Sequence, residues 1–412
     1  MPDRQLPYIK FAANQFNCFG NRGDISSWEN FGNWIYGLNS DITLTPARVD
    51  AIKKMTDTIK SDKAKARFLY EYMQKSMRYV SIQLGIGGYK PFAASFVDDK
   101  KYGDCKALSN YMRALLNVVG IKAYCALIRA GENEQSADFG FPHNDFNHEI
   151  LCIPFKNDTT WLECTSDKTP FGELGSFTEN RTALLITEQG GKLVNTPKSK
   201  ATDNQFSTTV HLQLDPSGSA KAQIDLASTG EYRLLYLQSD ALKLDEQKQF
   251  WLEQMQAKQP SAFDLESGKD TNYMKKVSLK LDYDKFVDVM AGDKQFYRPS
   301  VFKLWANTIP VLDSRKADFY WEYPRIKSCV TIIDLPQGYE VESLPANSNL
   351  KFTYGSYDVS YTYNKDKNQV TGTARFVLNN AVIPAPKYTE MQQFMDDIAK
   401  AQNKKLVLRK KA

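Results

Sequence analysis

Apolar residues change their spacing along the chain near residue 204. Before that point they recur every three or four positions over 46–59, 62–77 and 106–119, which is the spacing of one buried helix face. Beyond it, apolar and polar residues alternate in short runs, as is typical of strands with one buried face. The alternation predicts strands at 208–214, 220–226, 275–283, 328–335, 350–354, 359–363 and 369–378.

Strands are also predicted among the helices of the N-terminal half. One covers 80–84, and three more cover 121–130, 148–155 and 159–165. Residues 166–200 are rich in Gly, Thr and Lys and are predicted to form loops. Two further helices, at 245–257 and 389–401, interrupt the strands of the C-terminal half.

The fold class that follows from these elements is α+β. Residues 46–200 are predicted to form a core in which helices pack on a small antiparallel sheet. Residues 201–412 are predicted to form a β-rich, sandwich-like domain with a terminal helix. Residues 1–45 are aromatic and irregular, and we interpret them as the remnant or tail of a preceding β-rich domain.

Charge and composition exclude several classes of function. The net charge of +5, from 53 basic and 48 acidic residues, is small and dispersed, so no nucleic-acid partner is predicted. No run of about 18 apolar residues occurs, so no membrane-spanning helix is predicted, and the first residues lack a signal-peptide pattern. The six cysteines form no CxxC pair, so neither a metal site nor another cofactor is predicted.

One cysteine occupies a position that suits a nucleophile. In the run Tyr102-Gly103-Asp104-Cys105-Lys106, Gly103 allows close backbone approach and Asp104 is a good N-cap residue. Cys105 is therefore predicted in the first turn of the helix that follows, where free backbone N–H groups and the helix dipole favour an anion. Such a position favours a reactive thiolate.

A nucleophilic cysteine needs a histidine and a polar group that orients it. The chain has only three histidines, His143, His148 and His211. His148 opens a predicted strand and is the candidate base. His143 is predicted as a surface residue or the rim of a pocket, and His211 as a partly exposed strand residue.

The orienting acid is expected on the next predicted strand. Glu163 lies in that strand, and Asp167, just beyond it, is the alternative acid. Gln83 is a candidate second donor, beside the backbone N–H of Cys105, for an oxyanion.

These motifs resemble the transglutaminase-like superfamily, whose core has a papain-like Cys-His-Asp arrangement. The match lies in Gly103-Asp104-Cys105, in His148 at a strand start and in Trp161-Leu162-Glu163-Cys164-Thr165. The run from Arg78 to Lys106 is similar to a bacterial branch, common in Bacteroidetes, whose core lies between two β-rich domains of unknown function. Glu163 and Cys164 stand where the family usually has Asp and Pro, and Ala107 where the branch often has an acid.

The resemblance implies cysteine-dependent acyl transfer on amide bonds, most simply peptidase- or amidase-type hydrolysis, with a protein, peptide or cell-wall-type amide as substrate. It also implies a periplasmic or secreted protein whose signal peptide has been removed. The alternative is an inactive scaffold that binds peptide or glycan, which the Asp-to-Glu departure favours. A sugar-binding module at 204–412 is a third reading, suggested only by its aromatic residues.

Overall fold

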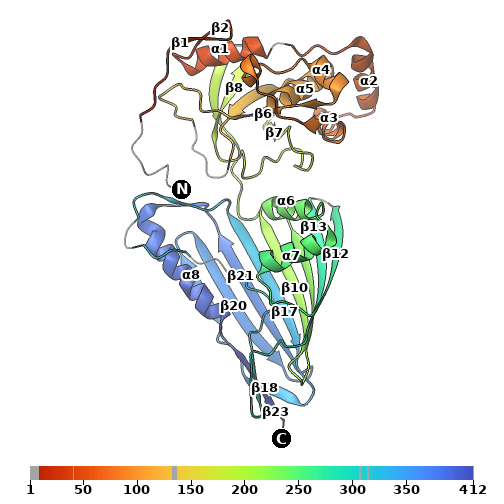
Figure 1. Cartoon of the computed structure of the whole chain (residues 1–412), viewed down its shortest axis with the longest axis vertical. Helices are drawn as coiled ribbons and strands as arrows, with labels where there is room; N and C mark the ends of the chain where they lie inside the picture. The colour runs from red at the N-terminus through yellow and green to blue at the C-terminus, as the bar shows by residue number, and fades with distance from the viewer. Residues whose placement is uncertain are drawn as a thin grey trace. The chain divides into compact units, whose positions relative to one another are not determined.

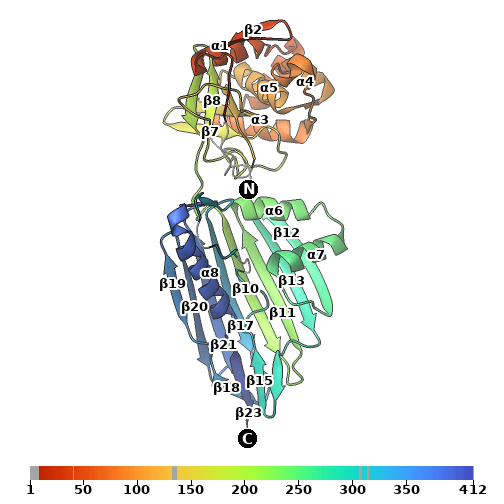
Figure 2. The same ribbon diagram turned by 60° about the vertical axis from the view of Figure 1, so that its left-hand side comes forward.

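The computed structural model describes residues 9–39, 41–131, 137–271, 273–305, 309–312 and 315–411. The chain divides into two compact units, residues 1–198 and residues 199–412. Helices and strands mix in the first unit, coloured red to yellow, whereas strands dominate the second, coloured green to blue (Figures 1 and 2). The predicted α+β class is therefore confirmed.

The first unit is built from helices and short strands in the order of the chain. Its helices are α1 (Trp28–Leu38), α2 (Pro46–Thr56), α3 (Asp62–Ser76), the 3-10 turn η1 (Gly85–Gly88), α4 (Ala94–Lys100) and α5 (Cys105–Val118). Its strands are β1 (Gln15–Cys18), β2 (Asn21–Asp24), β3 (Arg78–Tyr79), β4 (Tyr102–Gly103), β5 (Tyr124–Ile128), β6 (His148–Phe155), β7 (Asp158–Leu162), β8 (Thr182–Thr187) and β9 (Gly190–Asn195).

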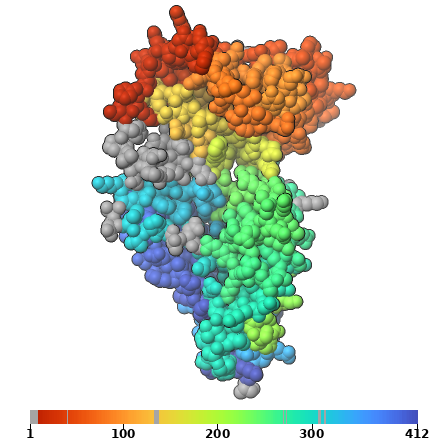
Figure 3. Space-filling model, in the orientation of Figure 1, coloured from red at the N-terminus to blue at the C-terminus, as the bar shows by residue number. Residues whose placement is uncertain are grey.

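Helix α5 is the centre of this unit. Every side chain from Cys105 to Met112 is buried, which is typical of a helix enclosed by other elements rather than lying on the surface. It packs against β5 and β6 on one side and against α2, α3 and α4 on the other. In the space-filling view, orange residues form the right-hand part of the surface of the first unit, beside red and yellow residues (Figure 3).

The sheet of this unit has the order β7-β6-β5-β8-β9, and all of its pairings are antiparallel. Strands β8 and β9 lie within residues 166–200, where only loops were predicted. The predicted strand at 80–84 is instead an extended segment outside any sheet, and pairing stops at Tyr79 in β3.

Helix α1 lies directly on β8 and β9, and two glycines make the approach possible. A Cβ atom on Gly32 of α1 would lie 1.9 Å from the backbone nitrogen of Gly191 in β9. Neither position can hold a larger side chain without separating the helix from the strand. Residues 28–38 are therefore packed into the first unit, while their origin in a preceding domain stays a prediction.

The second unit contains one large sheet with helices on one face. The sheet has the order β12-β13-β11-β10-β17-β21-β20-β19, and its only parallel pair among the described residues is β10 with β17. Its strands are β10 (Gln205–Leu214), β11 (Ala220–Ser228), β12 (Ala262–Thr271), β13 (Met274–Tyr283), β17 (Arg325–Asp334), β19 (Ser348–Phe352), β20 (Gly355–Asn364) and β21 (Gln369–Leu378).

Smaller elements complete this unit. They are the helices α6 (Gly230–Ser239), α7 (Leu244–Met255) and α8 (Tyr388–Gln402), the 3-10 turn η2 (Ala385–Lys387), the four-stranded sheet of β14 (Val289–Ala291), β15 (Lys294–Tyr297), β23 (Leu406–Lys410) and β18 (Tyr339–Ser343), and the pair β16 (Phe319–Tyr320) and β22 (Val382–Ile383). Side chains of α6, α7 and α8 share one hydrophobic core with the large sheet.

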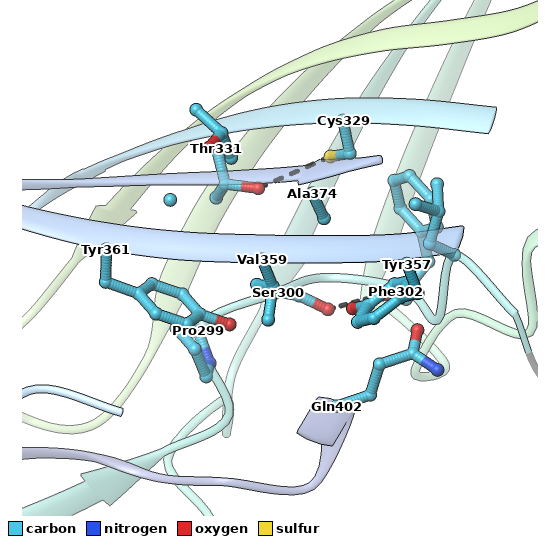
Figure 4. A pocket seen from close by; sticks show the side chains of 13 residues that line it. Pro299, Ser300, Phe302, Cys329, Thr331, Tyr357, Val359, Tyr361, Ala374 and Gln402 are labelled. Atoms are coloured by element: carbon cyan, nitrogen blue, oxygen red, sulfur yellow. Dashed lines mark hydrogen bonds between the residues drawn. The ribbon is translucent and has the colours of Figure 1, made fainter. Parts of the chain in front are cut away.

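A small cavity with mixed polar and apolar lining lies within the second unit (Figure 4). It has a volume of about 40 Å³ and lies among β17, β20, β21 and the segment 299–304. Cys329 and Thr331 contact each other there, with Sγ 3.4 Å from Oγ1, and burial raises the pKa of the Cys329 thiol. The space suits about two or three water molecules, whereas small-molecule sites typically hold roughly 300 Å³ or more.

One charged side chain points into the core of the second unit. Lys327 of β17 pairs with Phe206 of β10 and with Phe376 of β21. Its Nζ atom lies 5.6 Å from the ring centre of Phe206 and 5.7 Å from those of Tyr232 and Trp305. No described carboxylate forms an ion pair with this ammonium group.

Burial, together with the charge of Arg325, lowers the pKa of Lys327 to about 7. Removing the ammonium group from water favours the neutral amine, whereas the surrounding rings attract the cation and oppose that effect. We expect the cost of burial to be the larger of the two. Lys327 consequently costs the fold stability wherever it is protonated.

Replacing this lysine by an uncharged residue of similar length is expected to stabilise the protein. Lys327→Met should raise the free energy of unfolding at pH 7 by about 1–3 kcal/mol, measured by denaturant or thermal unfolding of the whole chain. The unfolded lysine titrates near 10.5 and the folded one near 7. The gain should therefore be largest at and below pH 7 and shrink as the pH rises toward 10.

Lys221→Met, on the exposed side of β11, is the matched control and should change stability by less than about 0.5 kcal/mol. A Lys327→Met protein that is less stable than the wild type at pH 7 would show that the aromatic rings stabilise the ammonium group.

Candidate active site

The predicted nucleophile lies at the start of the central helix. Asp104 is the N-cap of α5, and its Oδ1 atom accepts a hydrogen bond of 3.0 Å from the backbone N–H of Ala107. A Cβ atom on Gly103 would lie 2.8 Å from the Cβ of Ala107, so this turn needs a glycine. The predicted cap is confirmed, and it places Cys105 among the free N–H groups of the first helical turn.

The Asp104 carboxylate has a second partner. Its other oxygen forms a buried ion pair with the ammonium group of Lys106. Both side chains are nearly inaccessible, so the pair has little competition from water and holds the helix start rigidly.

The predicted base lies across from this helix start. His148 is the first residue of β6, which packs beside α5. Its Nε2 atom lies 3.0 Å from Oε2 and 3.1 Å from Oε1 of Glu163. The Cys105 thiol lies near enough to this imidazole to contribute to its raised pKa. Since Glu163 occupies Nε2, Nδ1 is the ring nitrogen that remains for the thiol.

The His148 imidazole and the Glu163 carboxylate are both buried and stabilise each other as ions. Burial alone would lower the pKa of His148, but the charge of Glu163 and hydrogen bonds to Cys105 and Glu163 raise it to about 10. Burial would likewise raise the pKa of Glu163, yet His148 and Thr165 hold that pKa below its ordinary value. The imidazole is therefore a cation throughout the neutral pH range.

The Glu163 carboxylate is fixed by its own surroundings. Its Oε1 atom accepts hydrogen bonds from the backbone N–H of Thr165 at 3.1 Å and from the Thr165 hydroxyl at 2.6 Å. Tyr70 of α3 donates its hydroxyl to the backbone oxygen of Glu163 at 2.8 Å. Gln74, one turn further along α3, donates to the backbone oxygen of Ser166 at 2.9 Å. Helix α3 thereby holds the segment that carries the acid.

The other two candidate residues, Asp167 and Gln83, have no described hydrogen bond to His148 or Cys105. Asp167 is exposed in the turn beyond β7, and Glu163 is the acid that contacts the histidine. Gln83 is exposed on the segment that follows β3, where the N–H of Val80 donates to the backbone oxygen of Gly103 at 2.9 Å. No described hydrogen bond joins Gln83 to Cys105, so its role at an oxyanion stays a prediction.

The two remaining histidines differ. His211 is exposed on β10, as predicted. His143 is buried, and its Nε2 atom lies 2.8 Å from Oδ2 of Asp145. It lines a hollow of about 400 Å³ with Trp34 and Tyr89, so it belongs to a pocket wall rather than to the open surface.

A second buried carboxyl lies behind the nucleophile helix. Glu149 follows His148 in β6, and burial raises the pKa of its carboxyl to about 7. The Asn39 amide lies 3.5 Å from its Oε2 atom, and the Ser109 hydroxyl of α5 donates to its backbone oxygen at 3.2 Å. Because neighbouring strand residues point to opposite faces, this carboxyl supports α5 from behind and does not enter the His148 site.

The sequence did not reveal three residues that shape the site. Phe177 contacts the His148 ring, with the ring centres 5.7 Å apart. Thr165 donates a hydrogen bond to the Glu163 carboxylate, and Tyr70 donates one to the Glu163 backbone oxygen. Thr165 could have been found from the sequence, because its hydroxyl lies two residues after Glu163. Phe177 and Tyr70 come from distant segments, and no local sequence pattern connects them to the site.

Neither a metal-binding cluster nor a membrane-spanning helix is found among the described residues. They contain no group of three or more His, Cys, Asp or Glu side chains that could hold a metal ion. None of their helices is long and apolar enough to cross a bilayer.

Comparison with known families finds two matches. Residues 50–168 match the transglutaminase-like superfamily, and residues 293–408 match a domain of unknown function with a solved structure, DUF3858. No curated protein matches the chain.

A solved structure shares the fold. It is that of a "putative protease" from Parabacteroides distasonis, with a TM-score of 0.52 and 10% sequence identity. The match covers 92% of this chain and 58% of that protein, so the chain spans little more than half of its length.

The charged state of His148 gives a pH test. Glu163→Gln removes the carboxylate charge, so the His148 pKa should fall from about 10 by about 1–3 units. Because the folded-state pKa is raised, the stabilisation from the wild-type pair is complete below pH 6.5 and is lost as the pH rises through about 10.

With three histidines in the chain, imidazole NMR titration resolves each one, and His148→Asn assigns the signal. His211, exposed on β10 in the other unit, is the internal control, and the substitution should not change its signals. A His148 midpoint that is the same in Glu163→Gln and wild type would contradict the ion pair.

Proposed function

The chain belongs to the transglutaminase-like superfamily through residues 50–168, and from this we propose that it is a cysteine-dependent hydrolase of amide bonds in peptides or proteins. The observation that carries the proposal is the arrangement of three side chains: a thiol at a helix start, an imidazole in polar contact with it, and a carboxylate that holds the far side of the ring. This is the order of groups that thiol acyl transfer needs.

In the proposed reaction, the Cys105 sulfur attacks the carbonyl carbon of the amide. The His148 imidazolium gives its Nδ1 proton to the departing amine, which leaves an acyl-enzyme thioester. A water molecule then attacks the thioester, and His148 takes up one proton of that water. The carboxylic acid is released, and sulfur leaves as the thiolate that attacked in the first step, so the thiolate–imidazolium pair is restored.

Glu163 has a positioning role in this scheme. It holds Nε2, so the imidazole can present only Nδ1 to sulfur and substrate, and its charge keeps the imidazole protonated for the first step. Glutamate reaches one carbon further than the family's usual aspartate, and the hydrogen bonds from Thr165 fix this longer side chain.

The developing oxyanion needs donors at the helix start. The backbone N–H of Cys105 is one of the unsatisfied N–H groups of α5, and the helix dipole favours negative charge there. Gln83 remains our candidate for the second donor. Hydrolysis, with water as acceptor, is proposed in preference to cross-linking because water needs no second binding site. Export to the periplasm or beyond is proposed only on the resemblance to the bacterial branch.

Thiol reactivity tests the proposal directly. Near pH 7, Cys105 should react with iodoacetamide on the order of tenfold or more faster than Cys18, because it lies in the first turn of α5 beside the His148 cation. Cys18 is half-buried and is the natural internal reference, while Cys105 and the other four cysteines are buried. Faster labelling of Cys105 would therefore reflect its chemistry and not its exposure. Peptide mapping by mass spectrometry gives both rates in one sample.

His148→Asn should remove the advantage, and Cys105→Ala should reduce any peptide hydrolysis by at least about 10³-fold. Equal or slower alkylation of Cys105 than of Cys18 in the folded protein would reject catalysis. The scaffold that binds peptide or glycan would then be the better account.

A further inference from the structure

Phe177 is an exposed aromatic residue that contacts the proposed base. Half of its surface is open to solvent, yet its ring meets the His148 ring edge to face, at an angle of 69°. Single exposed apolar residues are ordinary on protein surfaces. This one differs because its partner is the imidazole that contacts Cys105.

The backbone around Phe177 is held in place. The N–H of Gly131 donates to the Phe177 oxygen at 3.0 Å, and the N–H of Thr178 closes a turn onto Gly175 at 3.2 Å. Arg181 donates from its guanidinium group to the backbone oxygen of Ser176 at 3.0 Å. The ring is therefore presented by an ordered turn, so little conformational entropy is lost when a ligand packs on it.

Apolar surface also flanks the cysteine side of the site. Strand β3 pairs with β4, which ends two residues before Cys105, and it places Tyr79 opposite Gly103. The side chains of Tyr79 and Val80 are both exposed. Exposed apolar residues therefore lie on segments next to both Cys105 and His148.

The proposed reaction determines which half of the peptide lies beside His148 and which lies beside Cys105. In the proposed reaction His148 protonates the departing amine, so groups beside His148 face the amine half of the scissile bond, and groups beside Cys105 face the acyl half. Phe177 touches His148 and therefore lies on the amine side.

We propose that Phe177 determines specificity by packing against the side chain of the residue that supplies the departing amine, so the enzyme cleaves before apolar residues. This inference rests on the proposed hydrolase function and adds the class of substrate to it. Ring-to-side-chain contact of this kind is worth about tenfold in kcat/KM between an apolar residue and glycine.

A peptide library tests this without a known substrate. Peptides from a protease-digested proteome are incubated with wild type, Cys105→Ala and Phe177→Ala, and new N-termini are identified by mass spectrometry. With wild type, Leu, Ile, Val and Phe should be enriched severalfold at the first residue after the cleaved bond. Phe177→Ala should lose this enrichment, and Phe177→Leu should keep most of it.

Two matched peptides then give the magnitude. They share one acyl half and differ only in Leu or Gly after the scissile bond, so they form the same acyl-enzyme. The ratio of their kcat/KM values should fall about tenfold in Phe177→Ala. Phe68→Ala, on the outer face of α3, is the control and should leave the ratio unchanged.

The outcomes separate the two claims. Absence of any Cys105-dependent cleavage would reject the hydrolase, and the inference with it. Cleavage with no apolar enrichment, or enrichment that persists in Phe177→Ala, would reject the inference alone. An equal fall in rate for both peptides in Phe177→Ala, with Cys105 alkylation also slowed, would show that the ring only shields His148, which also rejects it.

Discussion

The first unit depends on one buried ion pair, that of His148 with Glu163. Placing two charged groups out of water is expensive, and it is tolerated only when each has its full set of partners. Here the acid has Thr165 as well as the imidazole, and the imidazole has Cys105 as well as the acid. Removing either charged partner leaves the other charge without compensation, and removing Thr165 or Cys105 takes away a polar partner, so the four residues form a single electrostatic unit.

The surrounding strands and helices of the first unit hold this ion pair in position. Strands β6 and β7 are antiparallel neighbours, and Leu151 lies opposite Leu162, so the acid follows directly from a fixed strand. Helix α5 presents Cys105 from the other side, with its start locked by Asp104 and Lys106. Three separate elements thus meet at one point, and the dense packing between them leaves little freedom for any of the reacting groups to move.

The sequence predicted those parts of the structure that local chemistry determines. The α5 start, β6 and the acid-bearing strand follow from capping residues and periodicity, and they were found within a few residues of their bounds. Strands β8 and β9 were missed because Gly190 and Gly191 resemble a loop, although close packing on Gly32 is what requires glycine there. The contact of Phe177 with His148 could not be predicted from the sequence, because it joins a turn to a strand and gives no periodic pattern.

The parallel pairing of β10 with β17 constrains how the chain can be made. The Thr208 hydroxyl contacts the backbone oxygen of Ser328 across a separation of 120 residues. On the ribosome β10 can pair with β11, which follows it after a short turn, but its other edge must wait until β17 has emerged. For that interval a nascent strand edge is open to pairing with other chains. Slow translation through this region would prolong the hazard, and binding by a chaperone would relieve it.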